Sequence, residues 1–498
     1  MIFVRSNLKQ FNSKITYFLI IITSLLLSFP RSIVAQESVK NQDKKICGSS
    51  LNREIETILN QPIRQKENWG ILIESTKEKQ VLYQLNSHKF FIPASNTKLF
   101  PTAAILHKRG ENFTINTPIY IEKKPHENSS IQTLIIEGKG DPTLSKKQLE
   151  TIAQILKEKG IKEVNNVILI EGFLSSPSTN YTWEFEDIYF YFAVPVNSLI
   201  LEENTVNLTL NHHKINEQPF LVWSDELAGK QWSIESQVYS RDSLAEYNIT
   251  ILPLFARSSL EIKGDFPLDK TATIWRLSIP NPAQYFQESL VKILNEHDIK
   301  VNKSEIIENI KDFNKIEIKK QLLLEINSPN LAELIKITNQ DSNNLYAEVL
   351  LKYLADESMN QWESLDKIMT NFGVSKDDYK LKDGSGLSRH NLMTPSALVT
   401  LLQAINNSEY RETFYNSLSI ASENGTLKNR FQNTNLAHNL HGKTGTLTGV
   451  ASLSGYLKNQ DYGDLIFAIM VNQSTDTSPN LRSSIDQIVI LLGQMKKC

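Results

Sequence analysis

The spacing of apolar residues predicts helices near both ends of the chain. Apolar residues recur at helical spacing in 51–59, directly after Ser50, which is a candidate N-cap. A last helix is expected from Leu481 to the C-terminus, because one apolar stripe continues along it. Helical texture also dominates after position 325, in the stretches 332–337, 345–355, 362–372 and 395–405.

Runs of apolar and β-branched residues predict strands in three parts of the chain. Near the N-terminus, 69–74 and 80–85 are expected to form a hairpin closed by the loop 75–79. Near the C-terminus, 450–457 and 465–471 are expected strands. Between about 110 and 320, short β-like runs are separated by Gly/Pro turns and interrupted by a helix over 147–159; examples of these runs are 134–138, 167–170 and 206–210.

This order of elements predicts one domain that is split by an insertion. The first hairpin has no strand partners unless the C-terminal strands complete its sheet. The fold class is therefore α/β (α+β), an antiparallel sheet flanked by helices with one or two large inserted α+β domains. The parts are 36–108 and 325–498 for the main domain and 109–324 for the insertion. A chain of 498 residues also exceeds what a single core usually supports.

Composition excludes some classes of function. The chain is 40% apolar and 22% charged with a net charge of −2, so no strongly basic face for a nucleic acid is expected. The histidines are dispersed, and no metal-ligand spacing is present in the sequence. We expect neither a metal nor another cofactor.

The N-terminus is typical of a secretory signal peptide over 1–35. Basic residues (Arg5, Lys9, Lys14) precede an apolar run at 15–29, and small residues end near Ala35. The run is shorter than the roughly 20 residues of a membrane-spanning helix, which favours cleavage over an uncleaved anchor. The cleavage position stays open. The protein is expected to be exported to the periplasm or cell envelope.

Cys47 and Cys498 are the two cysteines of the chain, and each flanks an expected terminal helix. An even pair in an oxidising compartment is a candidate disulfide. The alternative, two separate thiols at the chain ends, stays open in the sequence.

The first candidate chemistry is the pair Ser95 and Lys98 in the stretch 93–100. Three positions along a helix place both side chains on one face, so the amine can take the hydroxyl proton. The spacing alone is weak evidence, because Ser6–Lys9 and Ser364–Lys367 share it. Pro101 should distort this helix if it falls in the interior.

Two later motifs strengthen the signal. Ser342-Asn343-Asn344 lies between helical stretches, and Lys443-Thr444-Gly445 precedes an alternating apolar run. In this order the three motifs resemble the signature of penicillin-binding proteins and class A β-lactamases. With the stretches 138–144, 183–199 and 383–388, the chain over 50–498 resembles the D-alanyl-D-alanine carboxypeptidase/endopeptidase family, the low-molecular-mass class C penicillin-binding proteins. The resemblance implies a penicillin-binding/β-lactamase-like transpeptidase domain.

The chemistry of these residues suggests a role for each, and the resemblance implies the same roles. Ser95 attacks a peptide-like carbonyl, and Lys98 is its base, with a pKa lowered by burial and by the second cation Lys443. Ser342 relays the proton to the leaving nitrogen. Asn344 offers its amide to the substrate backbone.

The Lys-Thr-Gly strand is expected to bind the substrate. Lys443 and Thr444 are suited to hold a terminal carboxylate, and Gly445 lets the substrate lie against the strand. Lys443 is expected to lie at a solvent-accessible cleft. The backbone N–H groups of Ser95 and Thr446 would form the oxyanion hole.

Asp187 is a candidate specificity residue by resemblance alone. It would face the amino end of the diamino acid in the cell-wall peptide, with Leu387 and Leu447 as walls. The alternative is a solvated loop acid.

The function expected from the sequence is an exported, penicillin-sensitive serine DD-carboxypeptidase/endopeptidase. Its partners would be peptidoglycan stem peptides, with β-lactams as inhibitors and no nucleic acid. Two alternatives stay open: a catalytically weak protein that binds peptidoglycan or penicillin, and a β-lactamase, for which no deacylating glutamate loop is evident. The sequence does not distinguish a monomer from a homodimer, or carboxypeptidase from endopeptidase preference.

Overall fold

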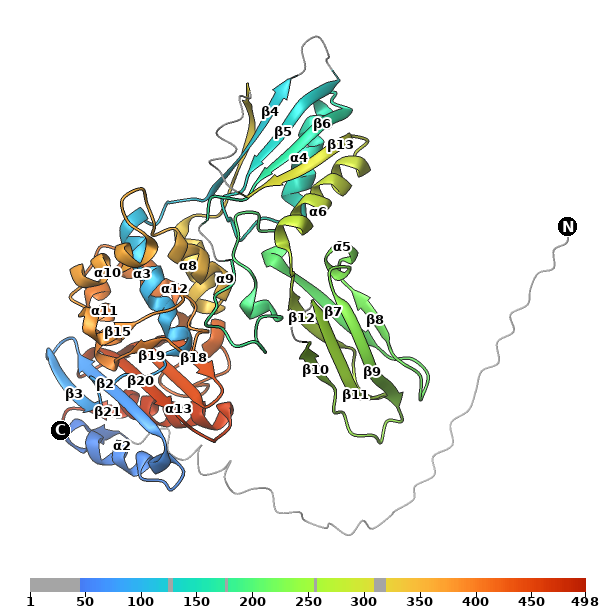
Figure 1. Cartoon of the computed structure of the whole chain (residues 1–498). Helices are drawn as coiled ribbons and strands as arrows, with labels where there is room; N and C mark the ends of the chain where they lie inside the picture. Colours follow the sequence, from blue (N-terminus) through green and yellow to red (C-terminus); the bar gives the residue numbers. More distant parts are fainter. Residues whose placement is uncertain (1–44, 124–128, 175–177, 255–257, 309–318) are drawn as a thin grey trace, which may run out of the picture. The chain divides into compact units, whose positions relative to one another are not determined.

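The structure is a computed structural model that describes residues 45–123, 129–174, 178–254, 258–308 and 319–498 (Figure 1). The expected signal peptide, 1–35, lies outside these residues. Within the described ranges, no helix combines the length and the apolar character needed to cross a membrane.

A six-stranded antiparallel sheet joins the two ends of the chain. Figure 1 shows the blue hairpin β2–β3 beside the orange and red strands β18–β20, and Trp69 of β2 is paired with Val471 of β20. The predicted pairing of the first hairpin with the C-terminal strands is therefore confirmed. In sheet order the strands are β17 (Ser419–Ile420), β18 (Leu440–Leu447), β19 (Val450–Asn459), β20 (Gly463–Asn472), β2 (Asn68–Ser75) and β3 (Gln80–Leu85).

Both faces of this sheet are covered, which explains why β20 at its centre is almost continuously apolar. Successive residues of a strand point to opposite faces. Leu72 of β2 belongs to one hydrophobic core, whereas its neighbours Ile71 and Ile73 belong to the other. The second core is completed by α2 (Leu51–Leu59) and α13 (Ser478–Gln494).

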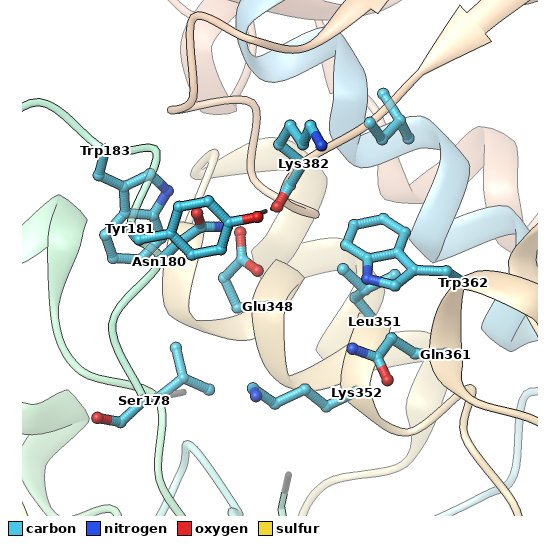
Figure 2. A pocket seen from close by; sticks show the side chains of 12 residues that line it. Ser178, Asn180, Tyr181, Trp183, Glu348, Leu351, Lys352, Gln361, Trp362 and Lys382 are labelled. Carbon is cyan, nitrogen blue, oxygen red and sulfur yellow. Dashed lines mark hydrogen bonds between the residues drawn. The ribbon is translucent and has the colours of Figure 1, made fainter. Parts of the chain in front are cut away.

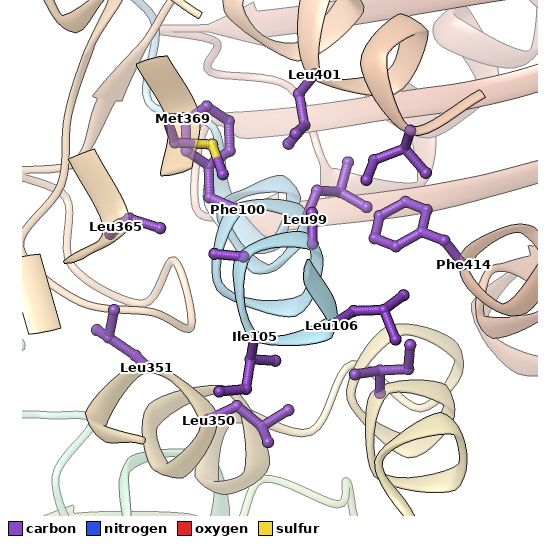
Figure 3. Close-up of a cluster of buried hydrophobic side chains, with 14 of the residues drawn as sticks. Leu99, Phe100, Ile105, Leu106, Leu350, Leu351, Leu365, Met369, Leu401 and Phe414 are labelled. Carbon is purple, nitrogen blue, oxygen red and sulfur yellow. The ribbon is translucent and has the colours of Figure 1, made fainter. Parts of the chain in front are cut away.

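The first core contains the helix that follows Ser95, α3 (Leu99–Arg109). Figure 3 shows Leu99, Phe100, Ile105 and Leu106 projecting from this helix among apolar side chains of its neighbours. Pro101 does not distort the helix interior, because the α-helix begins only at Leu99 and the first turn needs no N–H from that position. Around α3 lie α8 (Leu331–Gln340), α9 (Asn344–Lys352), α10 (Gln361–Asn371), α11 (Pro395–Asn406), α12 (Arg411–Ser417) and the two-stranded sheet β15 (Tyr379–Lys380) and β16 (Leu392–Met393).

The chain ends are joined covalently. Strand β1 (Ile46–Cys47) pairs in parallel with β21 (Met495–Lys496), and Cys47 and Cys498 form a disulfide with their Cα atoms 5.6 Å apart. The predicted disulfide is confirmed.

The middle of the chain forms three further sheets. One has the order β13-β6-β5-β4-β14 and packs with α4 (Lys146–Glu158) and α6 (Pro282–Glu296). Its strand β14 crosses the predicted boundary at 324/325. The strands of this sheet are β4 (Asn116–Lys123), β5 (Ser130–Glu137), β6 (Glu163–Ile170), β13 (Lys300–Ile307) and β14 (Gln321–Asn327). One smaller sheet contains, in order, β12 (Thr273–Ser278), β7 (Thr205–Asn211) and β8 (Phe220–Trp223). The other contains, in order, β10 (Thr250–Pro253), β11 (Ser259–Pro267) and β9 (Ser233–Arg241); the short helix α5 (Glu226–Gly229) also belongs to this part of the chain.

One stretch of the expected insertion does not stay outside the main domain. Val194, Val196 and Ile200 belong to the same hydrophobic core as α3, and Trp183 packs against Leu387. Alternation patterns could not indicate this, because the stretch has almost no regular secondary structure. The division into domains stays a prediction, but this stretch brings side chains of the insertion to the candidate site.

Candidate active site

Ser95 is held at the start of α3 by a tightly packed turn. It lies in the 3-10 helix η3 (Ala94–Lys98), and Ala94 has a left-handed φ of 48°. Asn96 is fully buried and hydrogen-bonded to Ser452 and Ser454 of β19. Ser452 Oγ also donates to the Pro93 carbonyl at 2.7 Å. The turn is thus fixed to the sheet on both sides of Ser95.

Lys98 is fully buried next to Ser95. Its Nζ donates to Ser95 Oγ at 3.0 Å, to Asn344 Oδ1 at 2.6 Å and to the Ser385 carbonyl at 2.6 Å. Burial lowers the pKa of Lys98 to about 7, against the opposing effect of the Asp383 and Glu348 carboxylates. A substantial fraction of Lys98 is therefore neutral near pH 7, as a base requires.

Lys443 forms a second buried lysine beside Ser342. Lys443 Nζ donates to Ser342 Oγ at 2.8 Å and to the Thr444 carbonyl at 3.1 Å. Burial, followed by the charge of Lys98, lowers the pKa of Lys443 well below its usual value. The two lysines therefore repel each other when both are charged, as expected, and burial is the largest cause of the low pKa of each.

The Ser342–Asn344 motif forms the turn between α8 and α9. Ser342 has a left-handed φ of 57°, and the side chain of Asn343 caps α9 by accepting the Tyr346 N–H. Asn344 Nδ2 donates to the Phe192 carbonyl at 2.6 Å, while its Oδ1 accepts from Lys98. Asn344 therefore connects Lys98 to the inserted stretch, in addition to the substrate contact expected from the sequence.

The Lys-Thr-Gly motif lies on β18. The structure gives a reason for glycine at position 445 in addition to the expected contact with the substrate. A Cβ there would lie 2.3 Å from Ser452 Oγ and 2.7 Å from the Pro93 carbonyl oxygen. The glycine thus makes room for the turn that carries Ser95. Thr444 Oγ1 donates to Thr426 Oγ1 at 2.8 Å.

A cleft of about 730 Å³ opens onto these groups. Among the residues that line it are Ser95, Ser342, Asn344, Thr426 and Thr446. Lys98 and Lys443 are both fully buried behind its surface. Lys443 was expected at a solvent-accessible position; its Nζ instead meets the cleft through Ser342.

Asp187 also lines the cleft, together with Leu387 and Leu447. Burial and the neighbouring Glu184 raise the pKa of Asp187, and Arg389 opposes them. Arg389 Nε in turn contacts Glu184 at 2.9 Å. The structure thus brings Asp187 into the same cleft as Ser95.

A model of the D-Ala-D-Ala carboxypeptidase 3 (S13) family matches residues 51–491. The chain belongs to this family.

Two curated members of known name align with most of the chain. "Penicillin-sensitive carboxypeptidase A" of Dictyostelium discoideum is 28% identical and is aligned over 95% of this chain and 97% of its own length. "D-alanyl-D-alanine carboxypeptidase" of Actinomadura sp. (strain R39) is 25% identical over 86% of this chain and 82% of its own. The crystal structure of penicillin binding protein 4 (dacB) from Haemophilus influenzae has a TM-score of 0.76 at 22% identity, covering 90% of this chain and 98% of that one. That likeness supports the penicillin-binding fold expected from the sequence.

In this S13-family chain the cleft also contains residues that sequence reasoning missed. Arg276 of β12 donates to Glu203 at 2.8 Å, and Glu203 accepts from Asn343 at 3.1 Å. Glu202, Glu203 and Asn204 all have left-handed φ angles, a rare conformation for residues other than glycine. Nothing in the sequence pattern marks Arg276, since it is one polar residue of an alternating strand.

The residues that the structure describes contain no group of three His, Cys, Asp or Glu side chains able to hold a metal ion.

Proposed function

We propose that this protein is an exported, penicillin-sensitive serine DD-peptidase that hydrolyses D-alanyl bonds of peptidoglycan stem peptides through an acyl-Ser95 intermediate. The observation that carries the proposal is the 3.0 Å contact from Lys98 Nζ to Ser95 Oγ, with Lys98 fully buried and its pKa near 7. A serine hydroxyl becomes an effective nucleophile when such a base takes its proton.

The acylation step begins with neutral Lys98. Ser95 Oγ forms a bond to the D-alanyl carbonyl carbon while its proton passes to Lys98 Nζ. The C–N bond then breaks, and the proton held by Lys98 passes through Ser342 Oγ to the leaving nitrogen, which returns Lys98 to its neutral form. Ser342 Oγ lies 2.8 Å from Lys443 Nζ. Water later hydrolyses the ester, which releases the acyl product as a carboxylic acid and restores Ser95.

Substrate binding is assigned to the neighbouring cleft residues. Lys443, Thr444 and the adjoining Thr426 hold the terminal carboxylate of the substrate, an attraction between opposite charges. The backbone N–H groups of Ser95 and Thr446 stabilise the oxyanion, an interaction whose loss typically costs about 3 kcal/mol of barrier. Gly445 leaves room for the Ser95 turn, and Asn344 orients Lys98.

Asp187 is proposed to bind the amino group of the diamino acid in the stem peptide. Its position in the cleft with Leu387 and Leu447 supports this role. Asp187 is half-buried, and a cationic partner would offset the cost that this burial imposes on its charged form.

Export to the periplasm or cell envelope is part of the proposal. The signal-like N-terminus and the Cys47–Cys498 disulfide support it, since disulfides persist mainly in oxidising compartments. The names of the two relatives support a D-alanyl substrate and sensitivity to penicillin.

Mass spectrometry after incubation with benzylpenicillin tests the acyl-serine mechanism. We expect a stable adduct of one penicillin on Ser95, together with release of D-alanine from a D-alanyl-D-alanine stem peptide. An adduct on another residue, or none on folded protein, would contradict the proposal. Rapid turnover of penicillin would indicate a β-lactamase, and binding of peptide without adduct or cleavage would indicate a binding protein.

A further inference from the structure

Glu348 is a buried carboxylate that the mechanism above does not use. It lies on α9 one helical turn after Asn344, so both side chains leave the same face of the helix. The side chain is almost fully buried, and its Oε1 accepts the backbone N–H groups of Gly384 at 3.0 Å and Ser385 at 2.8 Å.

Ser385 connects Glu348 to the base. The Ser385 carbonyl accepts from Lys98 Nζ at 2.6 Å, while the Ser385 N–H is held by Glu348. Asn344 Oδ1 accepts from the same Nζ at 2.6 Å. Helix α9 therefore holds Lys98 twice, directly through Asn344 and indirectly through Glu348 and the Ser385 peptide group.

Lys98 has neighbours of both negative and positive charge. Glu348 and Asp383 are the carboxylates that favour its ammonium form, and Lys443 approaches from β18 with the same charge as Lys98. Burial and the charge of Asp383 raise the pKa of Glu348 to about 7, and Lys352 faces Glu348 from the next turn of α9.

Both carboxylate oxygens of Asp383 are used in hydrogen bonds to its own loop and to Trp183. Its Oδ1 accepts from Gly386 N–H and Asn391 Nδ2, and its Oδ2 accepts from Trp183 Nε1 and Ser388 N–H. Asparagine at 383 would place an NH₂ group against two donors, so that substitution disrupts the loop.

Glu348 allows a cleaner substitution, because its third partner is the Ser385 hydroxyl, which can donate to a carboxylate or accept from an amide. Both of its backbone contacts use Oε1, which glutamine retains. The side chain also borders a cavity of about 270 Å³; Figure 2 shows it there with Asn180 and Trp183 of the inserted stretch and Lys352.

We propose that Glu348 is a positioning residue for proton transfer: it holds the Ser385 carbonyl against Lys98, and its negative charge stabilises the ammonium that Lys98 becomes when it takes the Ser95 proton. The inference rests on the proposed acyl-Ser95 mechanism. Glu348 acts through Lys98 and Ser385 and does not touch the substrate.

The test compares the pH dependence of acylation by benzylpenicillin in the wild-type protein and in Glu348→Gln. Loss of the negative charge disfavours protonated Lys98, so more of the base is neutral near pH 7, where the wild-type Glu348 is itself about half ionised. We expect the acid limb of the rate profile to move to lower pH, with acylation about two- to fivefold faster near pH 7, the order expected for partial removal of one nearby buried charge. Below pH 6 the two rates should converge, because Glu348 is then protonated in the wild type as well. The rate at high pH should change by less than about threefold, because Oε1 keeps both N–H contacts.

Glu333→Gln is the matched control, because Glu333 is an exposed glutamate at the start of α8. Its acid limb should coincide with that of the wild type. An unmoved acid limb in folded Glu348→Gln would overturn the inference and leave Glu348 as a structural residue. If the wild type itself is not acylated on Ser95, the proposed function fails instead, so the two failures are distinct.

Glu348→Asp tests the same inference should Glu348→Gln fail to fold. Aspartate keeps the charge but is too short to hold both N–H groups in place. Its acid limb should stay at the wild-type pH while the plateau rate falls about tenfold or more, an effect comparable to misplacing a catalytic group. A displaced acid limb or an unchanged plateau in this variant would overturn the inference.

Discussion

Gly386 and Ala94 lie so close together that a side chain at 386 would collide with the turn that carries Ser95. A Cβ at Gly386 would be 1.9 Å from the Ala94 carbonyl oxygen, which also accepts the Thr97 hydroxyl at 2.8 Å. Gly386 has a φ of +83°, a second reason for glycine at this position. The loop 383–388 therefore packs directly against the nucleophile turn, and we expect the two to move together.

Gly386→Ala is expected to slow acylation of Ser95 by at least about tenfold and to lower the free energy of unfolding by about 1–3 kcal/mol. Stopped-flow acylation and urea unfolding measure the two effects. Gly373→Ala is the control, because Gly373 has a φ of +80° but its nearest contact would be 3.9 Å away. It should lose stability without losing acylation rate; equal rates in both variants would contradict the proposed coupling.

The two residues of the first motif have separable roles. Ser95→Ala should abolish labelling by benzylpenicillin, since no other group accepts the acyl chain. Lys98→Ala keeps the hydroxyl but removes its base, so labelling should slow by about 10²–10⁴-fold. Intact-mass time courses on folded protein measure both. Labelling of Lys98→Ala at the wild-type rate would require a different base.

Acylation should depend on pH through Lys98. The neutral amine is the active form, and burial lowers the Lys98 pKa to about 7, so the rate should rise with pH and be half-maximal near pH 7. An unperturbed lysine would place this rise more than three pH units higher. Acylation rates measured from pH 5 to 9 at constant ionic strength test the point. A flat profile would show that Lys98 is not the titrating base.

The sequence predicted the parts of this molecule that follow from local pattern. The hairpin 69–85 could be placed beside the C-terminal strands because it had no other strand partner in the main domain. The three motifs lie around one cleft, as the sequence predicted. The prediction was possible because each motif contains residue types that the same reaction needs. Cys47 and Cys498 were correctly paired from their number and position.

What the sequence did not predict depends on packing between distant segments. Residues 178–201 pack against α9, and Trp183 is hydrogen-bonded to Asp383. Neither contact gives a periodic pattern in the sequence. The full burial of Lys443 was missed, because a lysine in a strand ordinarily indicates a surface. The packing role of Gly445 was also missed, because its neighbour Pro93 is distant in the chain. Its expected contact with the substrate stays a prediction.

The disulfide should stabilise the protein without affecting its chemistry. Cys47 and Cys498 are 451 positions apart, and the chain-entropy model assigns a closed loop of this size at most about 5 kcal/mol. Replacing both by serine should lower the urea midpoint while leaving the acylation rate of folded protein unchanged. Dithiothreitol should lower the midpoint of the wild type alone. A loss of acylation rate in the folded double variant would show that the chain ends influence the cleft.

Lys443 provides a test of carboxylate recognition, and its burial decides which substitution to use. Lys443→Ala would leave a cavity costing about 2 kcal/mol or more, whereas Lys443→Met fills the space and removes a buried amine with a lowered pKa. Lys443→Met should therefore keep the fold, as thermal unfolding can verify.

Burial disfavours the ammonium form of Lys443. An incoming carboxylate favours that form, because the two groups then have opposite charges. We expect Lys443→Met to raise KM for D-alanyl-D-alanine peptides by about tenfold or more, because a charge-assisted contact is lost. The same peptides with an amidated C-terminus provide the comparison, since they have no carboxylate to lose. An equal loss on both substrates would place the function of Lys443 in the proton relay through Ser342, to which it donates at 2.8 Å, and not in recognition of the substrate terminus.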